Sequence, residues 1–378
     1  MNLTRPVFRA DHELFRDQTR RFIAHAITPH YDIWETAGVT PPSLWQNAGV
    51  QGLLNCTLPE PFGSGGDFGH AAIVIEELAH ANVMGIGFSV HSDMVAPYIF
   101  AHGSDAQKAL WLPKMADGSA IGAVAMTEPD AGSDLKRIVT RAKSVDGGYL
   151  LNGEKTFITN GVNANMIIVA ASTAPEQGAR GITLFCLDAA TEGISRAGPL
   201  RKIGLHAQDV CEVFLDNVYV SEDCRLGLEN QGFDYLMSGL VQERLAIALG
   251  ACASLHARLA HAITYTSTRK VFGRRVIDHQ NTRFKLADAR AQATILRAFV
   301  DLCLQQHMQG RLSDVHAAMA KLQATELHSA VLDTLLQMYG GYGYMAEFDI
   351  GRAWCDARAM RLYGGTSEVL REIIGRSE

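Results

Sequence analysis

The sequence has no surplus of basic residues. Its 378 residues include 34 Lys and Arg against 40 Asp and Glu, which gives a net charge of −6 with histidine neutral. Proteins that attract nucleic acids or anionic membranes through a positive field carry the opposite balance. We therefore expect neither as a partner, and any phosphate-bearing ligand must be held by local groups.

The sequence also lacks the cysteine pattern of a disulfide framework or a cysteine-rich zinc site. Its cysteines are odd in number, scattered and without a C-x-x-C pair: Cys56, Cys186, Cys211, Cys224, Cys252, Cys303 and Cys355. This usage is typical of a reducing compartment. The histidines form no H-E-x-x-H string, so we expect no metal.

Long hydrophobic runs are missing as well. No apolar run approaches the ~18 residues that a membrane span needs, and Arg244 and Arg258 bracket one of the longest, 245–255. The first residues contain no apolar signal core. We expect no membrane span and a cytoplasmic location, or an organellar matrix for a processed eukaryotic chain.

Three zones of different composition follow one another. Residues 1–120 and 230–378 carry helix-period apolar positions, whereas residues 121–229 carry short β-rich runs between turn signals such as Asn152-Gly153. The expected helices are 9–27, 43–55, 69–81, 105–117, 233–266, 281–309 and 313–339. The expected strands are 121–127, 138–145, 149–159, 166–172, 182–187 and 210–220. The order predicts an α+β protein with a helical domain, an antiparallel sheet or barrel, and a helical bundle.

One glycine-rich string resembles a dinucleotide-binding motif. Residues 341–346, GYGYMA, fit G-x-G-x-x-A, but a Rossmann motif follows a strand. Here a helical pattern leads into the string, so a helix terminus with left-handed glycine is the better interpretation.

An acidic residue interrupts an apolar helix stripe. At 100° per residue, Leu236, Leu240, Glu243, Ile247 and Ala251 share one face. Glu243 is either an ion-paired residue or a general base whose pKa is raised by loss of water. The pattern leaves both open.

A glycine pair precedes the last expected helix. Gly364 and Gly365 remove side chains directly before Thr366, so backbone N–H groups can approach a phosphate or a developing oxyanion. The alternative is a tight turn with Thr366 as N-cap.

Five strings in the right order match one family. Residues 125–134 match T-E-P-x-x-G-S-D, residues 155–161 match [WF]-I-[TS]-N-G, and residues 269–280 match R-x-x-F-G…Q; residues 337–343 and 365–368 complete the set. The chain resembles the acyl-CoA dehydrogenase family along essentially its full length. Its C-terminal third resembles the long-chain branch in particular, and the chain as a whole resembles the long-chain and isovaleryl type with the base on the bundle helix. The family fold is an N-terminal helical domain, a middle β-domain and a C-terminal four-helix bundle.

The resemblance implies an FAD site shared between subunits. The residues expected at the flavin ring are Met126, Thr127, Phe157 and Thr159, and those near the ribityl-pyrophosphate and the acyl-CoA are Gly132 and Ser133. On the pyrophosphate and adenine side, the resemblance places Arg269 and Phe272 from the other subunit, together with Gln280, Gln337, Gly340 and Gly341. Thr366 and Glu368 also line the cofactor, and the substrate-binding set is Ser133, Arg244, Tyr363 and Gly365.

The chain departs from many family members at the catalytic base. They read Tyr-Glu-Gly-Thr where this chain has Tyr363, Gly364, Gly365 and Thr366. In the long-chain and isovaleryl branches the base lies on the bundle helix, at the position of Glu243. The helix stripe and the resemblance therefore converge on the same carboxylate.

By resemblance, Glu243 removes the α-proton of a saturated acyl-CoA while the β-hydrogen leaves as hydride to flavin N5. The backbone N–H of Gly364 and a ribityl hydroxyl polarise the thioester carbonyl, and the product is the trans-2-enoyl-CoA. A medium- or long-chain acyl-CoA of fatty acid β-oxidation is the expected substrate. Electron-transferring flavoprotein is the expected acceptor, and a homotetramer the expected assembly.

Three alternatives stay open. The scaffold also carries flavin oxidases or monooxygenases, although Glu243 in place of an aspartate base disfavours them. A dehydrogenase could take a branched acyl group or one bound to a carrier protein. Gly364, taken alone, is also compatible with a noncatalytic helical partner protein that has lost its flavin.

Overall fold

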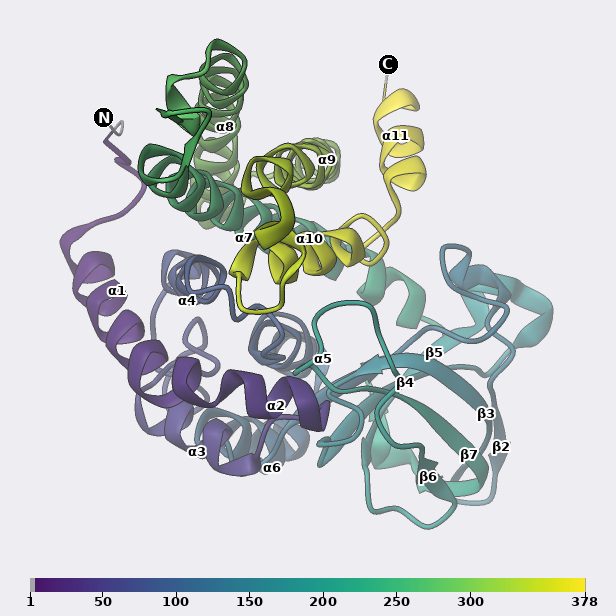
Figure 1. The fold of residues 1–378 in the computed structure, drawn as a ribbon. Helices are drawn as coiled ribbons and strands as arrows, with labels where there is room; N and C mark the ends of the chain where they lie inside the picture. Colours follow the sequence, from purple (N-terminus) through teal and green to yellow (C-terminus); the bar gives the residue numbers. More distant parts are fainter. Residues whose placement is uncertain (1–3, 378) are drawn as a thin grey trace.

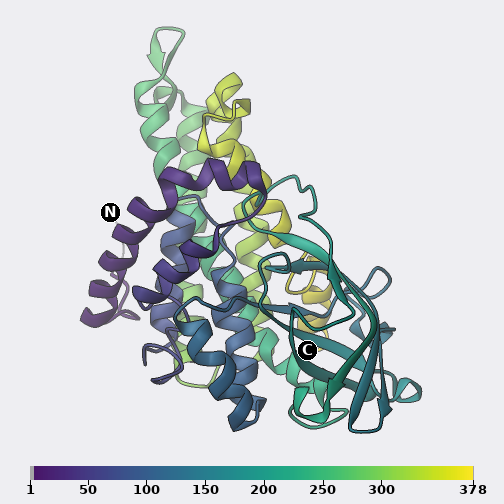
Figure 2. The same ribbon diagram turned by 90° about the horizontal axis from the view of Figure 1, so that it is seen from below.

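The computed structural model describes residues 4–377 and has an α+β fold built in chain order from helices, a sheet and a helical bundle (Figure 1). The first part contains α1 (Ala10–Phe22), α2 (Tyr31–Ala37), α3 (Pro42–Val50), α4 (Phe68–His80), α5 (Ala96–His102) and α6 (Asp105–Ala116). Two π-helical turns, Ile23–Ile27 and Val90–Val95, interrupt it. Figure 2 shows these helices beside the C-terminal bundle, and α4 packs against its two longest helices.

The middle part is an eight-stranded sheet. Its strands are β1 (Gly122–Ala125), β2 (Arg141–Val145), β3 (Gly148–Thr159), β4 (Met166–Ser172), β5 (Ile182–Asp188), β6 (Ile194–Arg196), β7 (Val210–Ser221) and β8 (Arg225–Leu226). The order is β6-β7-β3-β2-β4-β5-β8, with β1 paired to β4. Most pairs are antiparallel as predicted, but β1–β4 and β2–β4 are parallel, so the sheet is mixed.

The C-terminal part is built around one long helix. Its helices are α7 (Gly232–Thr268), α8 (Gln280–Met308), α9 (Asp314–Tyr339), α10 (Asp349–Met360) and α11 (Ser367–Gly375), and a small ladder joins β9 (Lys270–Val271) to β10 (Arg274–Arg275). Helix α7 is long and apolar enough to cross a bilayer, but 67% of its most apolar window is buried by protein. It is therefore the core helix of the bundle, packed on α4, α8 and α9.

The glycine-rich string of residues 341–346 follows a helix, as predicted. Helix α9 ends at Tyr339, and Gly340 has a φ of +58° before a 3₁₀ turn over Gly340–Tyr344. No strand precedes it, and the dinucleotide-motif reading is excluded.

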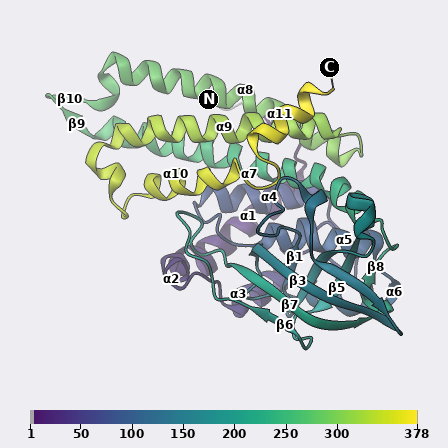
Figure 3. The same ribbon diagram turned by 90° about the vertical axis from the view of Figure 1, so that its right-hand side faces the viewer.

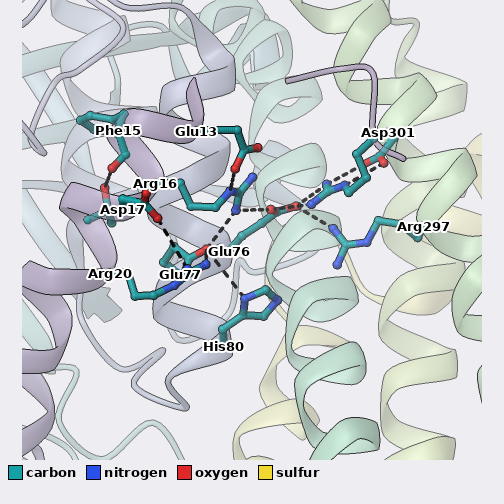
Figure 4. A network of polar contacts seen from close by, with 12 residues as sticks. Glu13, Phe15, Arg16, Asp17, Arg20, Glu76, Glu77, His80, Arg297 and Asp301 are labelled. Atoms are coloured by element: carbon teal, nitrogen blue, oxygen red, sulfur yellow. Dashed lines mark hydrogen bonds and ion pairs between the residues drawn. The ribbon is translucent and has the colours of Figure 1, made fainter. Parts of the chain in front are cut away.

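A buried charge network joins the first helices to the bundle (Figure 4). The Glu76 side chain is fully buried on α4, and its carboxylate accepts hydrogen bonds from Arg5 at 2.6 and 2.9 Å, from Arg16 at 3.0 Å and from Arg297 of α8 at 2.6 Å. Burial opposes ionisation of this carboxylate, but the guanidinium groups outweigh it and hold the pKa of Glu76 well below its usual value.

We expect Glu76→Gln to lower the free energy of unfolding by about 3–5 kcal/mol, because it leaves three guanidinium groups without their shared anion. Urea unfolding at pH 7 measures this. Glu13→Gln is the matched control: Glu13 also bonds Arg16 but is exposed, so its loss should cost less than about 1 kcal/mol. Since the pKa of Glu76 is depressed, its contribution is present above its ordinary value of 4.5 and should fade as the pH falls below it. Equal effects of the two variants would contradict the network's role.

Candidate active site

Glu243 lies in the fourth turn of α7 and faces the turn before α11. A Cβ placed on Gly364 would lie 3.2 Å from Oε1 of Glu243. The other carboxylate oxygen, Oε2, is buried and has no hydrogen-bond partner among the described residues. Loss of water raises the pKa of Glu243 to about 7, while the positive charges of Arg244 and Lys321 oppose the rise. A carboxylate so placed can accept a proton near neutral pH.

Arg244 does not neutralise this carboxylate. Its guanidinium is buried and pairs with Asp314 at the start of α9. Within residues 4–377 no basic side chain lies in ion-pair contact with Glu243. The ion-pair interpretation of the sequence pattern is therefore wrong for the described residues, and the general-base interpretation stays a prediction.

Gly364 and Gly365 form the turn between α10 and α11. Their φ angles are +64° and +93°, which favour glycine. A Cβ at Gly364 would also lie 2.4 Å from Cδ1 of Ile247 on α7, so a side chain there would require the end of the Ile247 side chain to move. The backbone N–H of Gly364 bonds no carbonyl of the described residues, whereas Thr366 caps α11 by accepting from Val369 N at 3.4 Å. The turn thus serves as a cap and also presents a free donor beside Glu243.

The residues predicted at the flavin ring meet where β1 ends beside β3. The backbone N–H of Thr156 donates to Thr127 O at 2.9 Å, which joins the two segments. Beneath them, buried Lys155 pairs with Glu128 at 2.7 Å. A β-bulge in the β3–β7 ladder falls between Lys155 and Ile158, and Phe157 there has a φ of +58° and is 67% exposed. The bulge turns an apolar ring outward, as bulges near functional sites commonly do.

The same region holds the remaining predicted residues of the middle domain. Met126 packs on a core that includes Leu236 of α7, so this end of the sheet lies beside the helix that carries Glu243. Gly132 and Ser133 are exposed in the turn that follows.

A second group of predicted residues lies at the other end of the bundle. A cavity of about 710 Å³ is lined there by Arg269, Gln337, Gly340 and Gly341. The Arg269 guanidinium stands 5.3 Å from the centre of the Tyr342 ring. The two glycines leave open space where a Cβ would project. Phe272, 96% exposed with a φ of +49°, and Gln280 are near neighbours in sequence but are not among the lining residues.

Helix α7 keeps the two groups apart. Glu243 and Arg269 are separated by 26 positions along a helical segment, which is about 39 Å at ~1.5 Å per residue. Figure 3 shows β9 and β10 at one end of the bundle and α11 toward the other. Arg269 and Gln337 therefore lie away from Glu243 within one chain. The residues that one chain does bring together are Glu243, Arg244, Tyr363, Gly364, Gly365 and Thr366, and Glu368 is exposed on the first turn of α11.

These features fit FAD. The far cavity offers a planar guanidinium for phosphate and two glycines that allow close approach. The near group offers the exposed apolar ring of Phe157, a surface on which a flat aromatic ring can pack. A dinucleotide cofactor needs both kinds of surface.

A smaller cavity, lined in part by Gly239 and Gln242 of α7, was not predicted from the sequence. It has a volume of about 380 Å³ and lies between α5 and α7, where Tyr98 and Gly239 line it. Pro97 has no N–H for the carbonyl of Asp93, and Nε2 of Gln242 donates to that carbonyl at 2.6 Å instead. The proline after a π-helical turn is the sequence signal that could have indicated this opening.

Comparisons with known proteins agree along the whole chain. Sequence models of the acyl-CoA dehydrogenase N-terminal, middle and C-terminal domains match residues 9–119, 123–218 and 230–378. The chain is 44% identical over 375 residues to the mitochondrial long-chain specific acyl-CoA dehydrogenase of Sus scrofa, covering 98% of this chain and 87% of that protein. It is 35% identical over 368 residues to the mitochondrial isovaleryl-CoA dehydrogenase of Oryza sativa subsp. japonica, covering 96% and 90%.

Solved structures give the same result. The crystal structure of acyl-CoA dehydrogenase from Geobacillus kaustophilus matches with a TM-score of 0.96 at 38% identity, covering 99% of each chain. A glutaryl-CoA dehydrogenase from Mycobacterium smegmatis in complex with FADH2 matches with a TM-score of 0.92 at 27% identity, covering 98% of this chain and 95% of that one.

Proposed function

Because the chain belongs to the acyl-CoA dehydrogenase family, an FAD-dependent family of oxidoreductases, we propose that it oxidises medium- or long-chain saturated acyl-CoA with Glu243 as the base. The observation that carries this proposal is the buried, unpaired Oε2 of Glu243 beside the Gly364 turn. Acyl-CoA is the substrate class of the family, and electron-transferring flavoprotein is its typical electron acceptor.

The two catalytic groups act on neighbouring parts of the thioester, namely its carbonyl oxygen and its α-proton. The α-proton of a thioester is weakly acidic, and the backbone N–H of Gly364 lowers the barrier by donating to the carbonyl oxygen as negative charge develops there. Glu243 accepts the α-proton, and exclusion of water raises its basicity. FAD bound beside them supplies the acceptor for the β-hydrogen as hydride.

The residues proposed to hold FAD divide between two subunits. Those of one chain are Met126, Thr127, Gly132, Ser133, Phe157, Thr159, Thr366 and Glu368. Those of the next are Arg269, Phe272, Gln280, Gln337, Gly340 and Gly341. The length of α7 supports this division, because a single chain holds the two groups apart. We propose a homo-oligomer, with a tetramer as the assembly.

The choice of a medium or long chain rests on two observations. The relative with 44% identity is named for long-chain substrates. The cavity of about 380 Å³ between α5 and α7 offers apolar lining from Met94, Pro97 and Leu312 for the acyl chain beyond the reacting carbons. The substrate-binding residues proposed around the thioester are Ser133, Arg244, Tyr363 and Gly365.

The test is a panel of acyl-CoA thioesters added anaerobically to the purified flavoprotein. We expect the flavin band to bleach most rapidly with straight medium or long chains, more slowly with butyryl-CoA and slowest with isovaleryl-CoA. If isovaleryl-CoA bleached the flavin fastest, the substrate would be a branched acyl-CoA instead of a straight medium or long one. Absence of bleaching by every thioester would overturn the proposed function. Peroxide formation in air would instead identify the oxidase alternative.

A further inference from the structure

Lys321 is a buried cation for which the mechanism above has no use. It lies on α9 with its side chain fully buried, among buried neighbours that include Ala317, Ala318, Ala320 and Leu322. Burying an ammonium group is costly unless it gains strong partners. Such a position calls for an explanation.

The ammonium group holds the glycine turn of the active site. Nζ of Lys321 donates to the carbonyl oxygen of Gly365 at 2.6 Å, the one hydrogen bond that this group makes among residues 4–377. Gly364 and Gly365 have the largest backbone freedom of any residue type, and both take left-handed φ angles here. A fixed Gly365 carbonyl therefore restrains the orientation of the neighbouring Gly364 N–H.

The same ammonium group and the proposed base on α7 both adjoin the glycine turn, because Nζ of Lys321 bonds the Gly365 carbonyl and a Cβ on Gly364 would lie 3.2 Å from Oε1 of Glu243. Lys321 and Glu243 attract each other, without a direct ion pair between them in the described part of the chain. Burial lowers the pKa of Lys321 to about 8, and Glu243 opposes that shift while Arg244 reinforces it. Lys321 is therefore largely charged at neutral pH.

Other charged groups around the pair are already engaged. Arg244 of α7 pairs with Asp314, and Glu326 of α9 pairs with Arg361 at 2.9 Å and accepts from the Ser367 hydroxyl at 2.5 Å. Burial raises the pKa of Tyr98 on α5, so this phenol stays neutral. Of the two cations near Glu243 in the described part of the chain, Arg244 is ion-paired, whereas Lys321 has no carboxylate in ion-pair contact.

We propose that Lys321 is a positioning residue of the dehydrogenation, which fixes the Gly364–Gly365 turn through the Gly365 carbonyl and stabilises the ionised form of Glu243 through its charge. This inference rests on the proposed function, because it assigns Lys321 to the base and the donor named there. The two actions are separable: one needs a hydrogen-bond donor, and the other needs a positive charge.

Two substitutions separate them in the holoenzyme. Lys321→Met removes both donor and charge, whereas Lys321→Gln removes the charge and keeps an N–H donor on a shorter side chain. The measurements are kcat and KM against pH with the best thioester of the panel, together with FAD content. Asp333→Asn is the control, because Asp333 is exposed on the same helix and its partner is Nε1 of Trp354, so the change leaves the contact between Lys321 and Gly365 in place.

Loss of the nearby cation makes Glu243 harder to ionise. Both Lys321 variants should therefore shift the acidic limb of kcat/KM upward by about 1 pH unit from its wild-type position near 7. Lys321→Met should in addition lower kcat by about 10-fold or more at high pH, where Glu243 is ionised, with a smaller change in KM. Lys321→Gln should keep more of that plateau, and Asp333→Asn should leave the limb in place.

The inference is overturned if the wild type shows the limb and both Lys321 variants keep it at the same pH. It is also overturned if all three variants change turnover alike, as a purely structural role would require. Should Lys321→Met fail to fold, the limb of Lys321→Gln decides alone. Failure of the proposed function is distinct, because the wild type would then bleach with no thioester at all.

Discussion

Glu243→Gln is expected to lower kcat for the best acyl-CoA by about 10³-fold or more while FAD stays bound, because a general base typically contributes ~10²–10⁴-fold and an amide cannot accept the α-proton. Glutamine has nearly the same shape as glutamate, so the change removes basicity and little packing. Rapid anaerobic mixing with the thioester measures the rate of flavin bleaching directly. Glu372→Gln, an exposed change on α11, is the control and should leave the rate unchanged.

Stability distinguishes loss of chemistry from loss of fold. Since burial raises the pKa of Glu243 to about 7 from an ordinary value of 4.5, its ionised form costs the folded state free energy as the pH rises. The Gln variant should therefore unfold at a higher temperature than the wild type at pH 8, and the gap should close toward pH 4.5. Turnover above a tenth of the wild-type rate would refute Glu243 as the base.

Combining Glu243→Gly with Gly364→Glu is expected to recover about 10–100-fold of the activity that Glu243→Gly alone loses, as a carboxylate at either position contributes as a general base. The two positions face the same space, because a Cβ on Gly364 would lie 3.2 Å from Oε1 of Glu243. Recovery should be incomplete for two reasons. Cδ1 of Ile247 must move away from the new Cβ, and the φ of +64° strains any side chain at residue 364.

The same bleaching assay measures the double variant, with Gly364→Gln in the Glu243→Gly background as its control. The glutamine variant carries the same strain and volume but no base, and it should stay inactive. A double variant that holds FAD and remains as slow as Glu243→Gly would show that the two positions do not reach the same carbon.

Long, strongly periodic elements were predictable from sequence. Helices α7, α8 and α9 and strand β4 lie within a few residues of the expected ranges, because each carries a sustained apolar period. Helices α2, α5 and α10 were missed, and so were β6 and β8–β10. Two of the missed helices adjoin π-helical or 3₁₀ turns that shift the period, and the missed strands have two or three residues each.

The active site was predictable only where a catalytic residue departs visibly from the local sequence pattern. Glu243 stood out as a charge on an apolar stripe, and Gly364 as a departure from a known string. Lys321 carried an equal mark, a lone charge among buried alanines of α9, but its contact with Gly365 joins residues 44 positions apart. The distance between Glu243 and Arg269 likewise depends on α7 being continuous, which the sequence pattern only suggested.

The span of α7 has a genetic consequence in the proposed oligomer. Each catalytic centre would be assembled from opposite ends of two copies of the same helix, so a lesion at one end harms the neighbour's centre rather than its own. Two alleles, one defective near the proton acceptor and one near the adenine cavity, would then form mixed assemblies in which some centres are wholly intact. Such alleles could complement each other although neither is active alone.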